Sequence, residues 1–284
     1  MNKKRSEQVA FIIFRILGIV VLAILFWILG FIIYHGVGVI NWKFLTTAPT
    51  EGMTAGGIFP AIVGTLCLVL GSIIIAFPLG VMSAIYTQEY AGKGWIVRFI
   101  RVMTSNLASI PSIVFGLFGM SLFVNKLGFG DSILAGSLTL SLLVLPLIIR
   151  TTEEALKAIP NSFRTGSYAL GATKLQTIRR VILPMAMPNI FTGLILSVGR
   201  VSGETAPILF TVAAYFLPKL PTSIFDQAMA LPYHLYVLAT SGANMEQTRP
   251  IAYGTALVLI MIVLIMNLLA AAIRKRLNKK LKSH

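Results

Sequence analysis

The sequence is poor in charged residues, has few acidic ones and contains almost no cysteine. Charged residues make up 12% of the 284 positions and only nine residues are acidic, whereas 56% are hydrophobic. A globular protein carries roughly twice that share of charge. A chain this apolar cannot cover its outside with polar groups, so it is not a water-soluble domain. A disordered chain is excluded as well, because disorder requires low hydrophobicity. The single cysteine, Cys67, excludes an intrachain disulfide and a cysteine-based metal motif.

Motifs for nucleotide hydrolysis and other enzyme chemistry are also missing. The sequence has no Gly-x4-Gly-Lys-Ser/Thr phosphate loop, no Gly-x-Ser-x-Gly elbow and no metalloprotease helix. His35, His234 and His284 do not have the spacing of metal ligands. We therefore expect a chain that is not an enzyme, has no catalytic residues or ATPase site of its own, and binds no metal or cofactor.

Six apolar blocks are long enough to cross a bilayer, whose core of about 30 Å needs roughly 20 helical residues. The sequence therefore predicts an all-α integral membrane protein with six transmembrane helices. The blocks are Ala10–Tyr34, Gly57–Tyr86, Ile96–Asn125, Ser132–Arg150, Met185–Phe216 and Ile251–Ile273. Prolines inside a helix remove a backbone hydrogen bond and predict kinks; they stand at Pro78, Pro111, Pro146 and Pro207.

The distribution of charge predicts the orientation in the membrane. The first block is too long for a signal peptide, and the basic residues of Met1–Glu7 favour a cytoplasmic N-terminus. Six spans then place 19 of the 24 Lys and Arg on the cytoplasmic side with four acids, against four basic and four acidic residues outside. Both termini are expected in the cytoplasm, with the chain embedded among membrane lipids. The net charge of +15 is explained by topology, so no nucleic-acid partner is needed.

Three segments follow from this reading. Residues 1–56 hold the N-terminal tail, the first span and an outer loop; residues 57–273 form a core of five spans; and residues 274–284 are a basic cytoplasmic tail. The outer stretch 217–250 contains four prolines. This stretch is equally consistent with a short interfacial or re-entrant helix and with a loop on the membrane surface.

The cytoplasmic stretch 151–184 is predicted to project from the membrane. A helix can begin just after Pro160, with Asn161 or Ser162 as its N-cap. Gly171 can end that helix in the left-handed conformation. We call residues 160–184 the elbow.

The second half of the elbow is predicted to be a short helix over residues 174–181, stopped by Pro184. The tip of the elbow, residues 163–171, mixes apolar and small side chains. An exposed apolar patch on a projection is typical of a partner site. The residue spacing is equally consistent with a tip that packs back against the transmembrane helices and binds no partner.

The elbow resembles the EAA loop of ABC importer permeases, in which a glycine is followed after nine residues by Ile-x-Leu-Pro. Here Gly171 precedes Val181-Ile182-Leu183-Pro184. The name-giving triplet is replaced by Thr165, Gly166 and Ser167, so the family's glutamate is absent and Arg164 is the nearest charged substitute. The resemblance implies docking to an ATP-binding subunit through Phe163, Arg164, Tyr168, Ala169, Leu170, Gly171 and Pro184.

Other segments narrow the resemblance to the phosphate branch of these permeases, the PstA type. They are "GGIFPAIVGTLCLVLGSIIIAFPLGVMSAIYTQEYA", "LASIPSIVFGLFG", "LPLIIRTTEEAL" and "GRVSGETAPILFT". The resemblance implies the MetI-like fold of type I ABC importers. It also implies a PstC-like second permease, two copies of an ATP-binding subunit that hold ATP and magnesium, an extracytoplasmic phosphate-binding protein, and a location in the inner membrane of a bacterial cell.

Arg200 and Glu204 are charged residues inside the fifth apolar block. A charge at the centre of a membrane helix costs about 2.5–3.5 kcal/mol and usually faces a pathway. With i,i+4 spacing the two side chains would share one helical face near the middle of the bilayer. The pair either lines a substrate path or locks two helices together.

Arg150 and Thr205 complete the candidate path. Arg150 ends the fourth span. It is either an ordinary cytoplasmic anchor or a substrate contact near the exit of the path. Its place in the PstA-like segment favours the substrate contact. Thr205 follows Glu204 and can line a path, although small polar residues also make helix contacts.

The sequence thus predicts a permease subunit of an ATP-driven phosphate importer. Two alternatives stay open, namely an ABC permease for another oxyanion and an ion-coupled secondary transporter. The second usually shows an internal repeat, and none is evident here. An intramembrane enzyme would need more catalytic groups than one Arg–Glu pair supplies.

Overall fold

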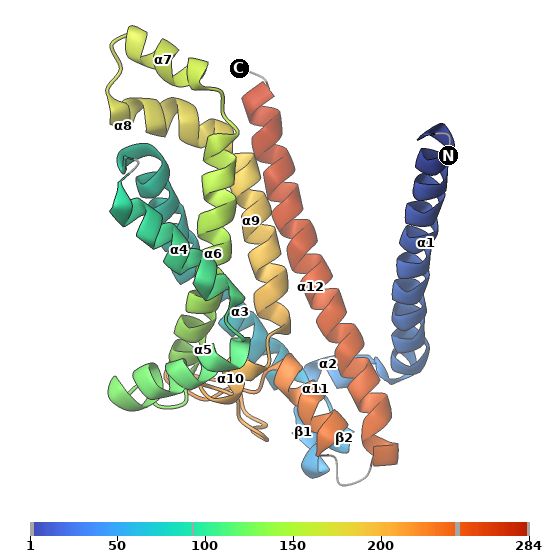
Figure 1. Ribbon diagram of the computed structural model, residues 1–284. Helices are drawn as coiled ribbons and strands as arrows, with labels where there is room; N and C mark the ends of the chain where they lie inside the picture. The colour runs from blue at the N-terminus through green and yellow to red at the C-terminus, as the bar shows by residue number, and fades with distance from the viewer. Residues whose placement is uncertain (1–2, 93, 242–244, 283–284) are drawn as a thin grey trace.

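The computed structural model describes residues 3–92, 94–241 and 245–282, and these are almost entirely helical (Figure 1). The long helices are α1 (Lys3–Gly36), α3 (Phe59–Ile85), α4 (Trp95–Ser109), α6 (Ile133–Lys157), α9 (Leu183–Gly203) and α12 (Met245–Lys282). The short helices are α2 (Trp42–Thr46), α5 (Ser112–Gly119), α7 (Asn161–Ala169), α8 (Lys174–Thr177), α10 (Ala206–Leu209) and α11 (Leu231–Thr240).

Three π-helical turns extend these helices. They are η3 (Tyr86–Tyr90) after α3, η4 (Met120–Lys126) after α5, and η5 (Ile178–Ile182) between α8 and α9. The link after α1 holds the 3-10 turns η1 (Val37–Val39) and η2 (Glu51–Met53) and the antiparallel strands β1 (Pro49–Thr50) and β2 (Ala55–Gly56). This link and α11 lie at the end of the bundle opposite to α7 and α8 (Figure 1).

Membrane spans agree with the six predicted blocks, with two corrections. Five continuous helical stretches are long and apolar enough to cross a bilayer, and a sixth is the pair α4 and α5, which are bent by 102° relative to each other. The bend falls at Pro111, which follows the extended residue Ile110. By contrast, α3 and α6 continue through Pro78 and Pro146 without interruption.

The fifth block is not one helix, which is the second correction. Helix α9 ends at Gly203, and the chain then turns through Glu204 and Thr205 into the four-residue helix α10, which has Pro207 in its first turn. Residues 210–216 are not helical. In Figure 1, α9 stops well short of the end of α12 that lies opposite the elbow, so the break lies within the height of the bundle.

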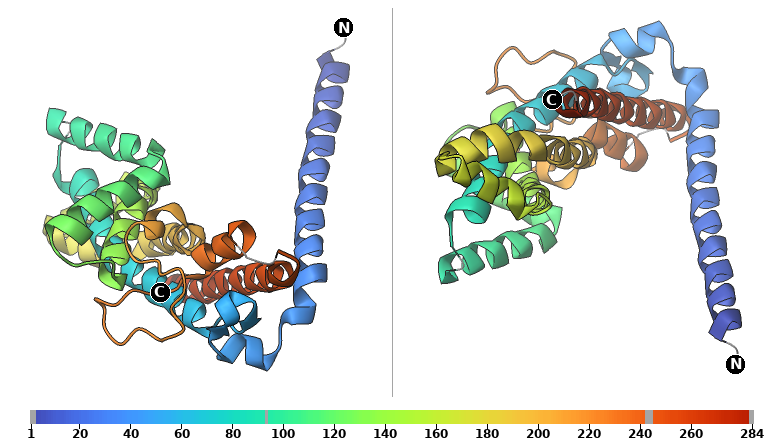
Figure 2. Two further views of the ribbon diagram at one scale, coloured as in Figure 1. Left: turned by 90° about the horizontal axis from the view of Figure 1, so that it is seen from below. Right: turned by 90° about the horizontal axis from the view of Figure 1, so that it is seen from above.

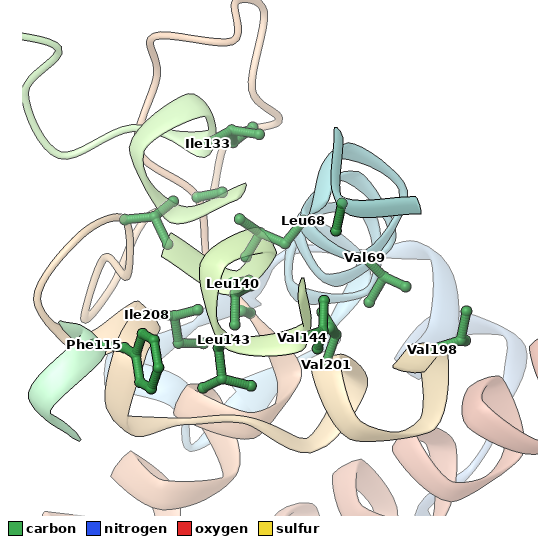
Figure 3. Packing of buried hydrophobic residues seen from close by; sticks show 14 of the residues in the cluster. Leu68, Val69, Phe115, Ile133, Leu140, Leu143, Val144, Val198, Val201 and Ile208 are labelled. Atoms are coloured by element: carbon green, nitrogen blue, oxygen red, sulfur yellow. The ribbon is translucent and has the colours of Figure 1, made fainter. Parts of the chain in front are cut away.

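The core is formed by α3, α6 and α9, with α6 in the middle. Among the five continuous spans, the apolar stretch of α6 is the most buried, at 61% against 39% for the next. Leu68 and Val69 of α3, Leu140 and Leu143 of α6, and Val201 of α9 meet there (Figure 3). Small residues let α3 approach α6 closely. A Cβ at Gly71 would lie 2.5 Å from Ser137 Oγ, and one at Gly80 would lie 2.6 Å from Ile148 Cγ2.

Helix α1 stands apart from this core (Figure 2). None of its apolar stretch is buried, and it meets the other spans at α12. His35 and Phe31 pack there on the ring of Tyr253, with ring centroids 5.2 and 5.6 Å apart. The apolar sides of α1 are therefore free for lipid or another membrane protein.

The contact of α3 with α6 gives the first prediction. Gly80→Val places new methyl groups against Ile148, and overpacking of this kind costs about 1–3 kcal/mol. Gly30→Val on α1 is the matched control, because a Cβ there meets nothing within 4 Å. We expect a lower midpoint of thermal unfolding in detergent for Gly80→Val only. Equal midpoints for the two variants would contradict this packing.

Candidate functional site

Arg200 and Glu204 form an ion pair, as the sequence predicted, but not on a helical face. Nε of Arg200 lies 3.5 Å from Oε1 of Glu204, and the two side chains are 36% and 18% exposed. Glu204 has the extended backbone angles φ −74° and ψ 128°, so it caps the end of α9 instead of continuing it. The prediction of one helical face was wrong because the helix ends one residue before Glu204.

Thr205 lies at the same break. It is the N-cap of α10, half-buried, and its hydroxyl makes no capping hydrogen bond. Glu204 also borders a narrow hollow of about 10 Å³ beside Ser202 and Thr65, too small for a polyatomic ion. The charged pair thus meets open space on the side of Arg200, where the side chain is exposed.

Arg150 lies on α6, away from this break and nearer to the elbow. Its Nε is 3.5 Å from Oε1 of Glu154, and both side chains are mostly exposed, at 70% and 66%. An exposed pair of this kind contributes little to stability. Arg150 borders a pocket of about 240 Å³ together with Arg101, Glu153 and Lys157. The structure therefore separates Arg150 from Arg200 and groups it with other charges at the elbow end.

The elbow projects from the bundle as a helix–turn–helix (Figure 1). No residue of α7 is buried, and Phe163, Tyr168 and Leu170 are 45%, 42% and 90% exposed. Ala169 is exposed as well. The tip does not pack back against the spans, so the second of the two readings from the sequence is excluded for these side chains.

Gly171 makes the turn at this tip. Its φ is +80°, the left-handed conformation that the sequence predicted, and the N–H groups of Gly171 and Ala172 donate to the carbonyls of Tyr168 and Ser167. The helix start was predicted less well. Pro160 is the N-cap, and Asn161 is already helical, with its side chain accepting a hydrogen bond from Arg164.

The second helix of the elbow does not end at Pro184. Thr173 and Gln176 form a capping box at the start of α8, which then runs through η5 into α9. Pro184 lies in the first turn of α9, where its missing N–H is tolerated after the widened π-helical turn. It is half-buried at the base of the elbow, away from the exposed tip.

Arg164 points inward from α7 and binds Glu89 of η3. Nη2 of Arg164 lies 2.6 Å from Oε1 of Glu89 and Nε lies 3.3 Å from Oε2, a two-pronged pair whose side chains are only 14% and 6% exposed. The guanidinium also donates to the carbonyls of Leu156 and Ile159 at 3.0 Å each. Arg164 therefore ties the elbow to the ends of α3 and α6.

Glu153 of α6 is the second buried carboxylate at this end. It accepts a 2.6 Å hydrogen bond from Thr87 Oγ1 and lies 3.5 Å from Arg101 Nε and 3.6 Å from Lys157 Nζ. Its side chain is 9% exposed. Side chains from η3, α4 and α6 therefore meet at this one carboxylate. Glu89, which binds Arg164 of the elbow, belongs to the same π-helical turn as Thr87.

The histidines give no metal site among the described residues, where no group of three or more His, Cys, Asp or Glu could hold an ion. Burial lowers the pKa of His234 in α11 to about 4, so its imidazole is neutral near pH 7. His284 lies outside the described residues.

Comparison with known proteins defines the class. Residues 76–283 match the family "Binding-protein-dependent transport system inner membrane component". That match covers more than half of the chain, and the chain belongs to this family of ABC importer permease components.

Particular relatives are more informative still. The chain is 37% identical over 279 residues to the phosphate transport system permease protein PstA of Mycobacterium leprae, covering 96% of this chain and 90% of that one. It is 35% identical over 240 residues to the probable PstA of Methanocaldococcus jannaschii, covering 84% and 83%. It is 34% identical over its whole length to a probable ABC transporter permease, YqgI, of Bacillus subtilis, whose whole length it also covers.

Solved structures agree on the fold. A chain of the bacterial alginate ABC transporter, solved with its periplasmic protein, superposes with a TM-score of 0.70 at 15% identity, covering 98% of this chain and 99% of that one. A chain of the methionine transporter MetNI superposes with a TM-score of 0.58 at 19% identity, covering 78% and 94%. The predicted MetI-like permease fold is confirmed.

The turn at Gly171 gives the second prediction. Gly171→Val forces a β-branched residue to a positive φ, at a cost of about 1–3 kcal/mol, and should raise amide hydrogen exchange across residues 161–184. Gly166→Val is the control, because both positions have open space around a Cβ but Gly166 has no positive φ. Similar exchange in the two variants would show that the left-handed turn does not hold the elbow.

Proposed function

We propose that this chain is one of two permease subunits of an ATP-driven importer of inorganic phosphate. The assignment of phosphate as the substrate rests on the similarity to PstA proteins of a bacterium and an archaeon over most of the chain. The partly exposed Arg200–Glu204 pair at a broken span supports the same reading.

Arginine suits a transient phosphate contact for a physical reason. Its planar guanidinium can donate two parallel hydrogen bonds to an oxyanion and keeps its charge at any working pH. A transport site must also release the ion. Glu204 at 3.5 Å competes for the guanidinium and repels an anion held too long. Thr205, beside Glu204, adds a hydroxyl to this contact, and Arg150 acts later, near the exit.

A second permease is proposed because the candidate path residues of this chain lie on its surface. Arg150 and Arg200 lie on exposed surface, so one chain does not enclose a path. A PstC-like sister permease would face these residues across the path. The exposed sides of α1 offer a further apolar surface within the membrane.

The ATP-binding subunits are proposed to dock on the elbow. The exposed side chains of Phe163, Tyr168 and Leu170 form an apolar patch on a rigid projection. Two copies would bind, one for each permease, and ATP and magnesium would be held by those copies and not by this chain. A phosphate-binding protein would dock at the opposite, extracytoplasmic end.

The orientation follows from the same assignment. Both ends of the chain lie toward the end of the molecule that carries the elbow (Figure 1). If the ATPase docks there, both termini are cytoplasmic, in keeping with the basic residues that dominate this side. An ion-coupled carrier is not favoured, because the relatives are permease components of ABC transporters.

Arg164 is proposed to transmit motion inside the chain. Its bonds to Glu89, Leu156 and Ile159 join α7 to the ends of α3 and α6. Movement of the elbow by the ATPase would therefore move these spans directly. The role proposed for Arg164 is mechanical coupling within this subunit, in place of a charge contact to the ATPase.

The path prediction uses a double substitution. Arg200→Met strands Glu204 as an unpaired carboxylate, which either protonates or destabilises the protein, whereas Arg200→Met with Glu204→Gln removes both charges. We expect the double variant to assemble normally but to take up little phosphate in vesicles, measured per assembled complex. Phosphate uptake near the wild-type level would show that Arg200 and Glu204 have a structural role only.

The coupling prediction uses Arg164→Gln, with Arg179→Gln as the control, because Arg179 is an exposed arginine of the same elbow. The loss of a buried two-pronged ion pair should leave the ATPase bound but reduce phosphate transported per ATP by roughly tenfold, which corresponds to about 1.4 kcal/mol. Uptake and hydrolysis are measured on the same proteoliposomes. Normal coupling in Arg164→Gln, or equal losses in both variants, would contradict the proposed role.

A further inference from the structure

A cavity of about 830 Å³ opens at the elbow end of the molecule, between η3, α4, the end of α6 and α8. Figure 1 shows these four segments gathered at one corner. Arg98 and Arg101 of α4, Lys157 of α6 and Lys174 of α8 line it. Basic residues are common on the cytoplasmic side of membrane proteins, but here three separate elements direct them into one hollow.

The acidic groups nearby do not balance this charge. Glu89, the acidic residue among those lining the cavity, is held by Arg164. Glu153 is shared between Arg101 and Lys157. Arg98 has no ion pair among the described residues, and the ammonium group of Lys174 lies 5.1 Å from the ring centroid of Tyr90. With Arg164 and Glu153, which lie just outside the lining, the described residues around the cavity comprise five cations and two carboxylates.

Neutral donors complete the surroundings. Ser105 and Asn106 line the cavity, and so does Gly94, the N-cap of α4. The 15-residue helix α4 starts there with no side-chain cap and no acidic residue in its first turn. Its free N–H groups and its dipole add positive potential to that of the side chains.

The cavity also adjoins the pocket that contains Arg150. Arg101, Ser105 and Lys157 line both spaces. A row of cationic groups thus leads from Arg150 on α6 toward Arg98 and Lys174 beside the elbow. The volume falls within the range of small-molecule sites, and the excess of charge selects an anion.

We propose that this cavity is a binding site for a phosphate-type oxyanion on the cytoplasmic side of the permease. Arg98 and Lys174 are its principal ligands, since neither is engaged by a carboxylate among the described residues. The inference rests on the proposed function for its place at the exit of the path. The same chemistry fits free phosphate and the phosphate of an anionic lipid head group.

The test reads the cavity itself, so that phosphate bound elsewhere in the complex does not contribute. Ser105→Cys is introduced into the Cys67→Ala chain, and the assembled complex is placed in phosphatidylcholine nanodiscs. The rate at which an uncharged maleimide labels the introduced thiol is measured by mass spectrometry, with inorganic phosphate or chloride added. A second set of nanodiscs contains phosphatidylglycerol and no added phosphate.

We expect phosphate to slow labelling, and Arg98→Gln to raise the phosphate concentration required by about tenfold, the loss of one charge-assisted hydrogen bond. Lys174→Gln should act in the same direction. Arg276→Gln, which removes an exposed cation of α12 outside the cavity, should have no effect. If phosphatidylglycerol slows labelling and inorganic phosphate does not, the oxyanion bound in the cavity is that of a lipid head group.

Two results would overturn the proposal. One is labelling that neither phosphate nor phosphatidylglycerol slows, and the other is protection that is the same with and without Arg98. Phosphate uptake by the same complex, measured in parallel, separates the two hypotheses. Normal uptake without protection refutes the cavity site alone, whereas absent uptake refutes the proposed transport function.

Discussion

Helix α6 is the element on which the rest of the structure depends. It is the most buried of the five continuous spans, and both α3 and α9 pack along it through small residues and branched aliphatic side chains. In a membrane, helix association relies on close packing and interhelical polar contacts, because lipid tails are as apolar as the side chains. The elbow end of α6 is fixed in addition by charge. Glu153 binds Thr87, Arg101 and Lys157, and the last carbonyls near Leu156 and Ile159 are bound by Arg164.

The elbow end and the break after Gly203 use charge differently. At the elbow end the carboxylates of Glu89 and Glu153 are buried and fully engaged, which favours one rigid arrangement of α3, α6 and α7. At the break after Gly203 the pair Arg200–Glu204 is more exposed and has a single contact between its members. A buried network suits the transmission of movement, and an open pair at an interrupted helix suits brief contact with an ion.

Sequence reasoning predicted the parts that depend on local pattern. Hydropathy identified the spans, and the residue type at 171 predicted a left-handed turn, because only glycine adopts a positive φ without strain. It did not find the distant partners of Glu89 and Glu153, because Arg164 and Thr87 lie 75 and 66 positions away in the chain. Pattern alone also misjudged Pro184, because a π-helical turn before it removes the need to stop the helix.

The break after Gly203 shows the same limit. Residues 185–216 are apolar enough for one long helix, yet α9 ends one residue before Glu204, and the segments that follow it bind the start of α6. Ser132 and Ile133 at the start of α6 donate backbone hydrogen bonds to Thr211 and Asp226, contacts that no local pattern reveals. The charged pair was visible in the sequence; its geometry was not.

We expect the elbow and the adjoining ends of α3 and α6 to move as one body, held by Arg164. A direct test is the distance between spin labels at Thr165→Cys on α7 and Tyr86→Cys at the start of η3, in the Cys67→Ala chain of the assembled complex. We expect the same narrow distance distribution with and without ATP, and a broader one when Arg164→Gln is added. A shift of several Å on ATP binding in the chain with Arg164 intact would contradict it.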